Sequence, residues 1–348
     1  LYDHGIEYVF ANAGTDFAPI IEALVTASQK GNPSPKFLTV PHENVAISMA
    51  QGYYRIVGKP AGVMVHVTVG TANTICGLMN SSRDNVPTLL MAGRTPLTET
   101  GNIGSRNVGI HWGQENFDQG GMVREYVKWD YELRNEQPVD TLIGRALDIA
   151  NSEPRGPVYL TLPREVLGSK AKSPGDSPRS RSSGSTVSIP DISTLERTSD
   201  LILKAEKPLI VSGKLGCREY AFDVLDAFAT DFGLPVTQVD VPALPSDHPM
   251  NWGFTTGQHL PDADLVLVIE SSVPWIPRTV NPNRNCKLIH LSPDPFYARF
   301  PFRGFEMDVA LSGEPVESLK LLHEIMLTRS KGKKRTINAR RKLIFEKH

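Results

Sequence analysis

Short apolar runs alternate with segments of helical periodicity along the first half of the chain. The runs have the length and residue types of buried strands, and the periodic segments have the length of helices. Such alternation is typical of an α/β domain with a mainly parallel sheet. The predicted strands are residues 7–10, 36–40, 62–66, 87–93, 124–129 and 156–163, and the predicted helices are 18–28, 73–85, 139–151 and a segment that starts near Glu43.

The same alternation returns in the second half and predicts a second doubly wound α/β domain with a mainly parallel sheet. Its predicted strands are residues 208–211, 235–239, 263–270 and 287–291, and its predicted helices start at Ile192 and cover 220–231 and 315–328.

Composition shifts divide the chain. Residues 168–190 are rich in Ser, Pro, Gly, Lys and Arg and contain too little apolar surface to order themselves, so we predict a flexible linker. The predicted organisation is a first domain at 1–167, the linker at 168–190, a central domain at 191–328 and a basic tail at 329–348.

Composition and charge exclude several classes of protein. Of the 348 residues, 40% are hydrophobic and 22% charged, as in ordinary globular proteins, and the net charge of -1 gives no reason to expect nucleic acid as a partner. No apolar run is long enough to cross a membrane. The scattered Cys76, Cys217 and Cys286 argue against a disulfide framework or zinc site and favour a cytoplasmic location. The start at Leu1, without a methionine, suggests a fragment.

Two basic segments leave a nucleic-acid alternative open. The arginine/serine tract at 180–185 is short for an RNA-binding segment, and the tail at 329–348 could form a nucleic-acid patch. We favour the interpretation that this tail is a linker and first helix leading toward a further domain.

Polar side chains follow the first three predicted strands. Because the carboxyl ends of parallel strands share one edge of a sheet, Thr15, Glu43 and His66 are expected to converge there. Glu43 stands in a first helical turn, where the helix dipole favours its ionised form and burial would favour its protonated form. A carboxyl group in this position and a histidine are suited to acid/base chemistry.

Each candidate also has a purely structural explanation. Glu43 could be a favourable first-turn acid, and His66 a satisfied structural histidine. The turn before Thr15 could use Gly14 for backbone freedom and Asp16 as a helix cap.

A longer pattern around Glu43 favours the chemical interpretation. Residues 43–60 read Glu-x-x-Ala-x-x-x-Ala-x-Gly-Tyr-x-Arg-x-x-Gly-Lys-Pro, and an apolar strand ending in His66 and Val-Gly-Thr-Ala-Asn at 69–73 follow. This pattern resembles the pyrimidine-binding domain of thiamine diphosphate-dependent enzymes such as acetolactate synthase and benzoylformate decarboxylase. In that superfamily the glutamate hydrogen-bonds the aminopyrimidine ring of the cofactor and helps to generate the reactive ylid. The resemblance gives this role to Glu43.

Two turns extend the resemblance to benzoylformate decarboxylase. Residues 12–15, Asn-Ala-Gly-Thr, are similar to its Asn-Pro-Gly-Ser turn, and residues 70–73 are similar to a Gly-Thr-Gly-Asn turn that follows its His-containing strand. The resemblance implies that His66 and Thr15 face the substrate and that His66 handles proton transfers. It also implies that the pyrimidine end of the site is lined by Asn12, Gly14 and Asn73.

The departures from that relative prevent transfer of its substrate. Ala13 replaces a proline, Thr15 replaces a serine and adds a methyl group, and Ala72 replaces a glycine in the second turn. The resemblance therefore implies a 2-oxo acid as substrate without identifying which one.

The glycine-rich stretch at 95–123 is long and irregular. Loops of this kind tend to be functional or mobile. Gln114, Glu115 and Asp118 resemble a segment that borders the active site in acetolactate synthase-like enzymes, and a polar surface loop is the alternative.

The second half resembles the central domain of the same superfamily at His248-Pro249, Gly253, 263–267 and 290–295. Some relatives bind FAD or a nucleotide regulator there, so FAD is possible, but no local motif requires it. Two phosphate-binding signatures fail. Pro60 stands where a P-loop needs Ser or Thr, and Gly213 and Gly216 do not complete Gly-x-Gly-x-x-Gly.

The superfamily holds the cofactor diphosphate through Mg²⁺ on a third domain that carries a Gly-Asp-Gly motif. No Gly-Asp-Gly occurs in this sequence, so we expect the Mg²⁺ ligands on a missing domain and an incomplete, inactive enzyme. Because the cofactor of the relatives lies between subunits, the resemblance implies a homodimer or homotetramer.

The predicted function is that of a thiamine diphosphate-dependent 2-oxo acid decarboxylase or an acetolactate synthase-like carboligase. Two alternatives remain open from the sequence. One is a non-catalytic binding or regulatory partner of a complete homologue, and the other is a nucleotide-binding α/β protein.

Overall fold

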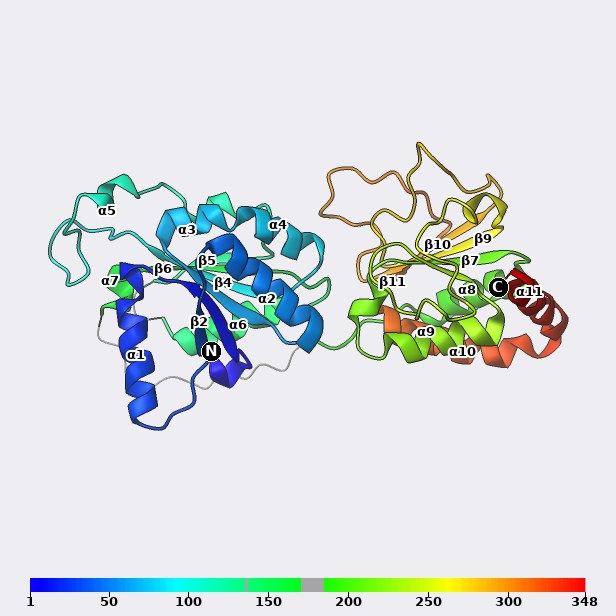
Figure 1. Cartoon of the computed structure of the whole chain (residues 1–348), viewed down its shortest axis with the longest axis horizontal. Helices are drawn as coiled ribbons and strands as arrows, with labels where there is room; N and C mark the ends of the chain where they lie inside the picture. Colours follow the sequence, from blue (N-terminus) through cyan, green and yellow to red (C-terminus); the bar gives the residue numbers. More distant parts are fainter. Residues whose placement is uncertain (135–136, 170–184, 348) are drawn as a thin grey trace. The chain divides into compact units, whose positions relative to one another are not determined.

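The computed structural model describes residues 1–134, 137–169 and 185–347, and the chain divides into two compact units, Leu1–Ser185 and Thr186–His348. Each unit is an α/β domain built on one sheet (Figure 1). Most of the predicted linker, at 170–184, lies outside the described residues. Within the described ranges, no helix combines the length and apolar character needed to span a bilayer.

The sheet of unit 1 has six parallel strands in the order β2-β1-β3-β4-β6-β5. The prediction of a parallel α/β domain is therefore confirmed. The strands are β1 (Tyr8–Asn12), β2 (Lys36–Thr39), β3 (Ala61–Val65), β4 (Thr88–Arg94), β5 (Asp130–Glu132) and β6 (Val158–Pro163).

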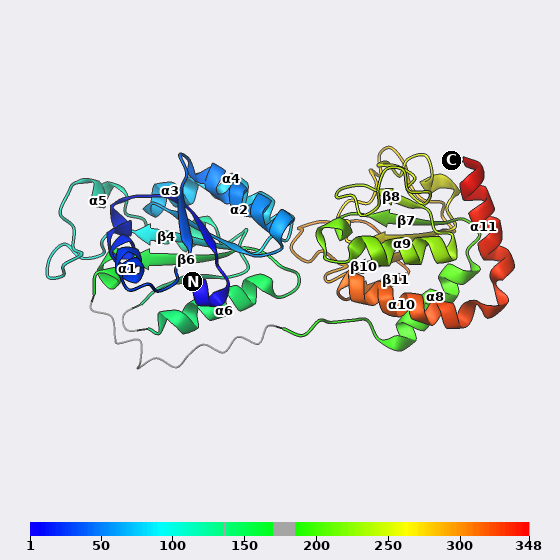
Figure 2. The same ribbon diagram turned by 60° about the horizontal axis from the view of Figure 1, so that its bottom comes forward.

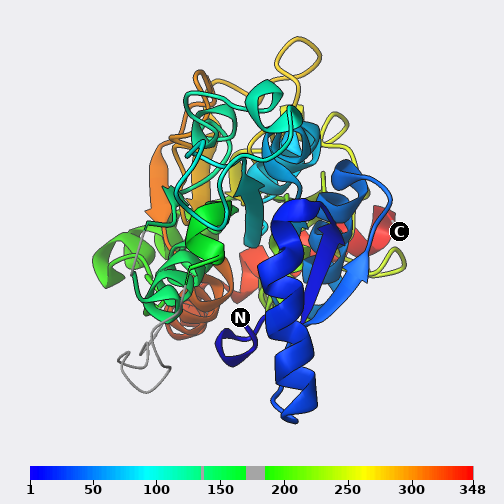
Figure 3. The ribbon, with the colours of Figure 1, turned by 90° about the vertical axis from the view of Figure 1, so that its left-hand side faces the viewer.

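Helices cover both faces of this sheet. Figures 1 and 2 show α2 and α4 on one face and α6 on the other, and Figures 1 and 3 show α1 beside β2. The α-helices are α1 (Ala18–Gln29), α2 (Glu43–Val57), α3 (Val67–Asn73), α4 (Ile75–Arg83), α5 (Ile110–Gly113), α6 (Val139–Asn151) and α7 (Arg164–Leu167), and the 3-10 helices are η1 (Tyr2–His4), η2 (Thr15–Phe17) and η3 (Gly120–Met122).

Alternate residues of the central strands enter two different cores. On β3, Val63 and Val65 join Ile47 of α2 in one cluster, whereas Met64 joins Leu147 of α6 in the other. A strand covered on both faces is apolar throughout, which is why it reads as a continuous run in the sequence.

Two local predictions in unit 1 are wrong. Residues 124–129 were predicted as a strand, but the backbone N–H groups of Tyr126 and Val127 both donate to the carbonyl of Val123, so this segment turns and the strand β5 follows it. Residues 70–73 were predicted as a turn, but they form the end of helix α3.

The sheet of unit 2 has five parallel strands in the order β11-β10-β9-β7-β8. The edge strand β11, which is the last strand along the chain, was not predicted. The strands are β7 (Pro208–Ser212), β8 (Val236–Gln238), β9 (Leu265–Ile269), β10 (Lys287–Ser292) and β11 (Val309–Ser312). The helices are α8 (Ile192–Lys204), α9 (Ala221–Phe232), α10 (Pro315–Arg329) and α11 (Lys334–Lys347), with 3-10 helices η5 (Leu215–Cys217), η6 (Leu260–Asp262) and η7 (Ser330–Gly332).

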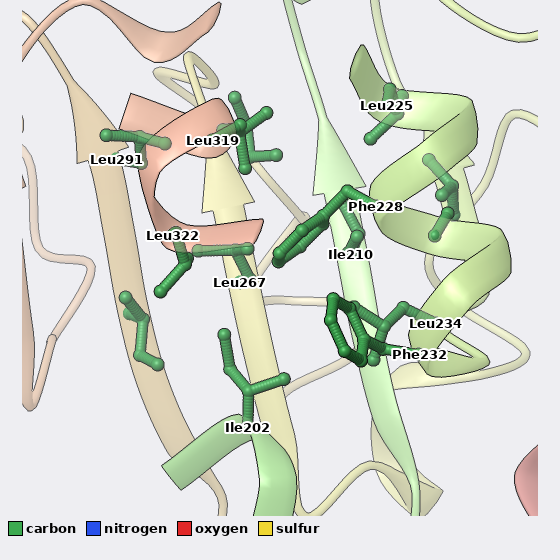
Figure 4. Packing of buried hydrophobic residues seen from close by; sticks show 14 of the residues in the cluster. Ile202, Ile210, Leu225, Phe228, Phe232, Leu234, Leu267, Leu291, Leu319 and Leu322 are labelled. Atoms are coloured by element: carbon green, nitrogen blue, oxygen red, sulfur yellow. The ribbon is translucent and has the colours of Figure 1, made fainter. Parts of the chain in front are cut away.

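The helices of unit 2 lie mainly on one side of its sheet. Figure 1 shows α8, α9 and α10 on that side and irregular segments on the other. Figure 4 shows Phe228 and Phe232 of α9 and Leu319 of α10 packing over Ile210 and Leu267 of the strands. This large apolar cluster is the main core of unit 2.

The basic segment predicted as a tail contains a helix that packs on unit 2. Ile337 and Ile344 of α11 are buried in the unit 2 core. Between them, Arg340 is 3% exposed, and its guanidinium donates to the carbonyl oxygens of Ile202 at 2.7 Å and Phe232 at 3.2 Å, and through Nε to Ala205 at 3.0 Å. These carbonyls close α8 and α9, so Arg340 places a positive charge at two helix C-termini.

Candidate active site

His66 stands at a sharp elbow between β3 and α3. The next residue, Val67, has a φ of 34°, which is strained for a β-branched side chain. A methyl group on Gly70 would lie 2.9 Å from Val65 Cβ, so a glycine there lets α3 fold back closely over β3. Strain of this kind persists only where the surrounding structure holds it, and it tends to occur at functional sites.

The imidazole of His66 is paired with a buried carboxylate. Its Nδ1 lies 2.6 Å from Oδ1 of Asp16, a residue that is 2% exposed. The other carboxylate oxygen, Oδ2, is buried and has no hydrogen-bond partner in the described part of the chain. The hydrogen bond to Asp16 raises the pKa of His66, burial opposes this shift, and the negative charges of Asp16 and Glu43 add to it.

Glu43 begins α2 and is 8% exposed. Asn73, the last residue of α3, donates from Nδ2 to Glu43 Oε2 at 3.1 Å. The N-cap residue His42 accepts from the backbone N–H of Asn44 at 3.1 Å, and its Nδ1 lies 3.9 Å from Glu43 Oε2. The first turn of α2 therefore carries a buried carboxylate with one oxygen held by an amide.

The position of Glu43 depends on close contact between α2 and α4. The side chain of Asn44 accepts from the backbone N–H of Gly77 at 2.8 Å. A methyl group on Gly77 would lie 2.2 Å from a side-chain carbon of Ile47, so only a glycine allows this approach. The contact fixes the helix that presents Glu43.

Of the remaining predicted site residues, Gly14 lies beside His66, whereas the side chains of Asn12 and Thr15 form no hydrogen bond with His66 or Glu43 among the described residues. A methyl group on Gly14 would lie 1.9 Å from His66 Nδ1, so Gly14 borders the histidine, and its extended backbone, with φ at -138°, shows that space and not backbone freedom requires the glycine. Asn12 donates to the carbonyl of Val40 at 2.9 Å and joins the ends of β1 and β2. Thr15 is exposed, and its side chain makes no hydrogen bond in the described part of the chain.

Asp16 is the site residue that the sequence did not identify as functional. It was interpreted as a possible helix cap, but it lies within η2 and its side chain makes no capping bond. The partner of His66 is 50 residues away in the chain, so the only local signal was an aspartate in a strand-to-helix turn.

The irregular stretch at 95–123 is anchored to the same edge of the sheet. Gln119 is buried and donates to the hydroxyl of Tyr159 at 2.9 Å and to the carbonyl of Gly93 at 2.8 Å. Thr68 of α3 donates to the carbonyl of Gln114 at 2.7 Å. These bonds hold the loop against β4, β6 and the start of α3, two residues beyond His66.

The acidic residues predicted at the site border serve as ion-pair partners within this loop region. Glu115 pairs with Arg94 and Arg106, and Asp118 pairs with Arg124. The loop also contributes His111, which was not predicted. It is buried, and burial together with the positive charges of Arg164, Arg106 and His66 lowers its pKa.

The described residues contain no group of three or more His, Cys, Asp or Glu side chains arranged to hold a metal ion. At this edge of the sheet, Glu43 offers a carboxyl group and His66 offers a paired imidazole. Such a combination can hold a polar ring through hydrogen bonds and move protons beside it.

Two family models match the chain. Residues 1–122 match the family model for the thiamine pyrophosphate enzyme, N-terminal TPP binding domain, and residues 195–322 match the model for the thiamine pyrophosphate enzyme, central domain.

Similar curated proteins include the acetolactate synthase large subunit of Haemophilus influenzae, which is 28% identical over 312 residues covering 85% of this chain and 51% of the relative. Benzoylformate decarboxylase of Pseudomonas aeruginosa is 26% identical over 60% of this chain and 37% of its own length. The chain thus spans about half the length, or less, of these relatives.

Solved structures share the fold. A thiamin diphosphate-dependent enzyme from Mycobacterium smegmatis is 26% identical, with a TM-score of 0.77 over 94% of this chain and 61% of that one. Benzoylformate decarboxylase from Polynucleobacter necessarius, at 21% identity and a TM-score of 0.76, has the same fold.

Proposed function

Since the chain belongs to the thiamine pyrophosphate enzyme family, we propose that it supplies the pyrimidine-binding part of a thiamine diphosphate-dependent active site that acts on 2-oxo acids. The reaction is either a decarboxylation or an acetolactate synthase-like carboligation. The names of the relatives, an acetolactate synthase and a benzoylformate decarboxylase, support both.

The observation that carries this proposal is the buried Glu43 carboxyl group in the first turn of α2. A buried carboxyl group is costly unless it meets a hydrogen-bonding partner. Asn73 engages only Oε2, which leaves Oε1 for a ligand. The ring nitrogen of an aminopyrimidine is a suitable partner, so the donor set fits the cofactor.

When bound, thiamine diphosphate supplies a carbon nucleophile for the substrate carbonyl and accepts the electron pair left by decarboxylation. In our proposal Glu43 holds a proton at the pyrimidine nitrogen, and Asn12, Gly14 and Asn73 line this end of the pocket. His66 moves protons at the substrate end, with Thr15 nearby.

We propose that the diphosphate and Mg²⁺ are held by residues other than those of this site, in keeping with the sequence, which has no Gly-Asp-Gly motif. Of the cofactor, the present site then holds the pyrimidine ring and not the diphosphate.

We also propose that a second copy of this chain covers the helices that carry the site. Val45 and Met49 of α2 and Val69 of α3 are exposed apolar side chains on the same helices as Glu43 and Asn73, and Met79 is exposed on the neighbouring α4. A second copy would shield them and exclude water from the site. Sedimentation velocity tests this point, because a Met49→Lys variant should shift a dimer toward monomer.

The function is tested by titrating the chain with 4-amino-5-hydroxymethyl-2-methylpyrimidine and with thiamine diphosphate plus Mg²⁺. Amide NMR shifts detect binding even at millimolar affinity. We expect weak pyrimidine binding that perturbs the amides near Glu43, His66 and Asn73 and disappears in Glu43→Gln. The control is Glu317→Gln, which alters another first-turn glutamate, in α10. Absence of binding, or binding that survives Glu43→Gln, would contradict the proposal.

A further inference from the structure

Four histidines pair with an aspartate among the described residues, and one pair differs from the others. In the pairs His4–Asp140, His248–Asp226 and His323–Asp231, the aspartate side chain is 42%, 41% and 45% exposed. In the pair His66–Asp16, it is 3% exposed. Water can solvate the first three carboxylates, but Asp16 depends on its protein partners.

Asp16 has few such partners. Its Oδ1 meets His66 Nδ1 at 2.6 Å, and its buried Oδ2 has no hydrogen bond in the described part of the chain. When the Asp16 carboxyl group is ionised it can only accept hydrogen bonds, and Nδ1 then carries the hydrogen. In that case Nε2 is the ring nitrogen that can gain or lose a proton.

The backbone is shaped around the pair on two sides. A methyl group on Gly93 would lie 1.8 Å from Asp16 Oδ2, and one on Gly14 would lie 1.9 Å from His66 Nδ1. The sharp backbone turn at Val67, directly after His66, also fixes the backbone of the histidine. The pair is therefore held by the fold and does not depend on a flexible surface contact.

We propose that Asp16 is a positioning residue that holds His66 with its hydrogen on Nδ1 and presents Nε2 as the nitrogen that accepts and returns protons in the site. The proton transfer to and from substrate rests on the proposed function. The assignment of the hydrogen to Nδ1 is independent of the proposed function.

Nε2 is free for this role in the described part of the chain. The His66 side chain is 28% exposed, and no hydrogen bond involves its Nε2 there. The charged and titratable groups that act on it are Asp16 from η2, Glu43 from α2 and His111 from α5. The two carboxylates favour the imidazolium form, in which Nε2 carries a proton that it can donate.

The sign of the resulting pH dependence follows from the raised pKa of His66. Below the ordinary value of about 6.5, the imidazolium form dominates in both the folded and the unfolded chain, and its pairing with Asp16 contributes fully to stability. As pH rises through the higher folded pKa, that contribution is lost. Replacing Asp16 with a neutral residue should remove this pH dependence.

The test is long-range ¹H–¹⁵N NMR of histidine side chains in the full chain, with the His66 signals assigned from a His66→Gln variant. We expect the neutral wild-type imidazole to be the Nδ1–H tautomer. In Asp16→Asn, the pKa of His66 should shift down toward its ordinary value. In Asp16→Ala, which also loses the hydrogen bond, the tautomers should become mixed.

The matched control is Asp140→Asn, which removes the carboxylate from the His4 pair and should leave the His66 signals unchanged. A wild-type His66 in the Nε2–H tautomer would overturn the proposal, as would an unchanged tautomer and pKa in both Asp16 variants. If these variants do not fold, the wild-type spectrum alone decides the tautomer.

The two proposals fail in different ways. The tautomer is read without any cofactor, whereas the function depends on Glu43-sensitive pyrimidine binding. An Nδ1–H tautomer with no pyrimidine binding would retain the Asp16 assignment and reject the function. An Nε2–H tautomer together with Glu43-dependent pyrimidine binding would retain the function and reject the Asp16 assignment.

Discussion

Gly93 of β4 faces Asp16 so closely that a methyl group added to Gly93 would lie 1.8 Å from Asp16 Oδ2. Asp16 in turn contacts His66, which packs on Gly14. The edge of the sheet thus holds a carboxylate and an imidazole in a space that two glycines leave open.

Gly93→Ala should therefore displace Asp16 and break its bond to His66. The crowding should also lower the free energy of unfolding of unit 1 by about 1–3 kcal/mol. Hydrogen exchange of the β4 amides measures the loss of stability, and the His66 tautomer reports the broken pair. Gly52→Ala is the control. Gly52 lies in the interior of α2 with open space around it, so alanine should stabilise that helix by about 1 kcal/mol.

Gln119→Leu should release the loop at 95–118. The substitution removes the donors to Tyr159 and to the carbonyl of Gly93, at a cost of about 1–3 kcal/mol. Trypsin cleavage at Arg106 should become roughly 5- to 150-fold faster if cleavage follows loop opening. Gln114→Leu is the control because Gln114 contributes to the anchoring through its backbone carbonyl, which the substitution retains. Equal cleavage rates in the two variants would show that Gln119 does not hold the loop.

Arg340→Met should destabilise unit 2. Burial lowers the pKa of Arg340 only to about 10, so the guanidinium is charged at neutral pH. Its removal leaves the carbonyls of Ile202, Ala205 and Phe232 without their donor, and we expect a loss of at least about 3 kcal/mol. Faster hydrogen exchange in α8 and α9 measures it.

The control for this experiment is Arg335→Met, which removes the same charge from an exposed position of α11. It should leave exchange in α8 and α9 unchanged. An equal effect of the two substitutions would mean that charge, and not the buried contacts, attaches the helix.

Thiol labelling should separate the three cysteines. Cys76 and Cys217 are exposed, whereas Cys286 is buried and burial raises its pKa to about 11. At pH 8 iodoacetamide should label Cys286 about 100-fold more slowly than an ordinary thiol, because the thiolate is the reactive form. Mass spectrometry of the peptides measures the rates, and denaturant should equalise them. Rapid native labelling of Cys286 would contradict the packing around it.

The sequence predicted much of the fold because the buried strands and amphipathic helices have different periodicities. Helix α6, at Val139–Asn151, was predicted at the observed boundaries. The strand predicted at 124–129 is wrong because its valine, Val127, and the preceding Val123 are buried from a turn and not from alternate positions of a strand. Apolar residues alone could not distinguish these two arrangements.

The site was less accessible to prediction. The resemblance led to Glu43 and His66, and the structure brings Asn73 to the first and Gly14 to the second. Asp16 could not be found as the partner of His66, because the two meet only when β1 and β3 become neighbours in the sheet. Contacts across a sheet leave no local pattern.

Gly14, Asp16, His66 and Gly93 also constrain how this sequence can change over evolutionary time. A larger residue at position 14 or 93 fits only if the side chain it meets becomes smaller. Single replacements at these positions should therefore be selected against, and tolerated changes should come as correlated pairs. In a broad set of relatives, position 93 should covary with position 16, and position 14 with position 66. Independent substitution at these positions would show that natural variants accommodate the carboxylate and the imidazole in a different arrangement.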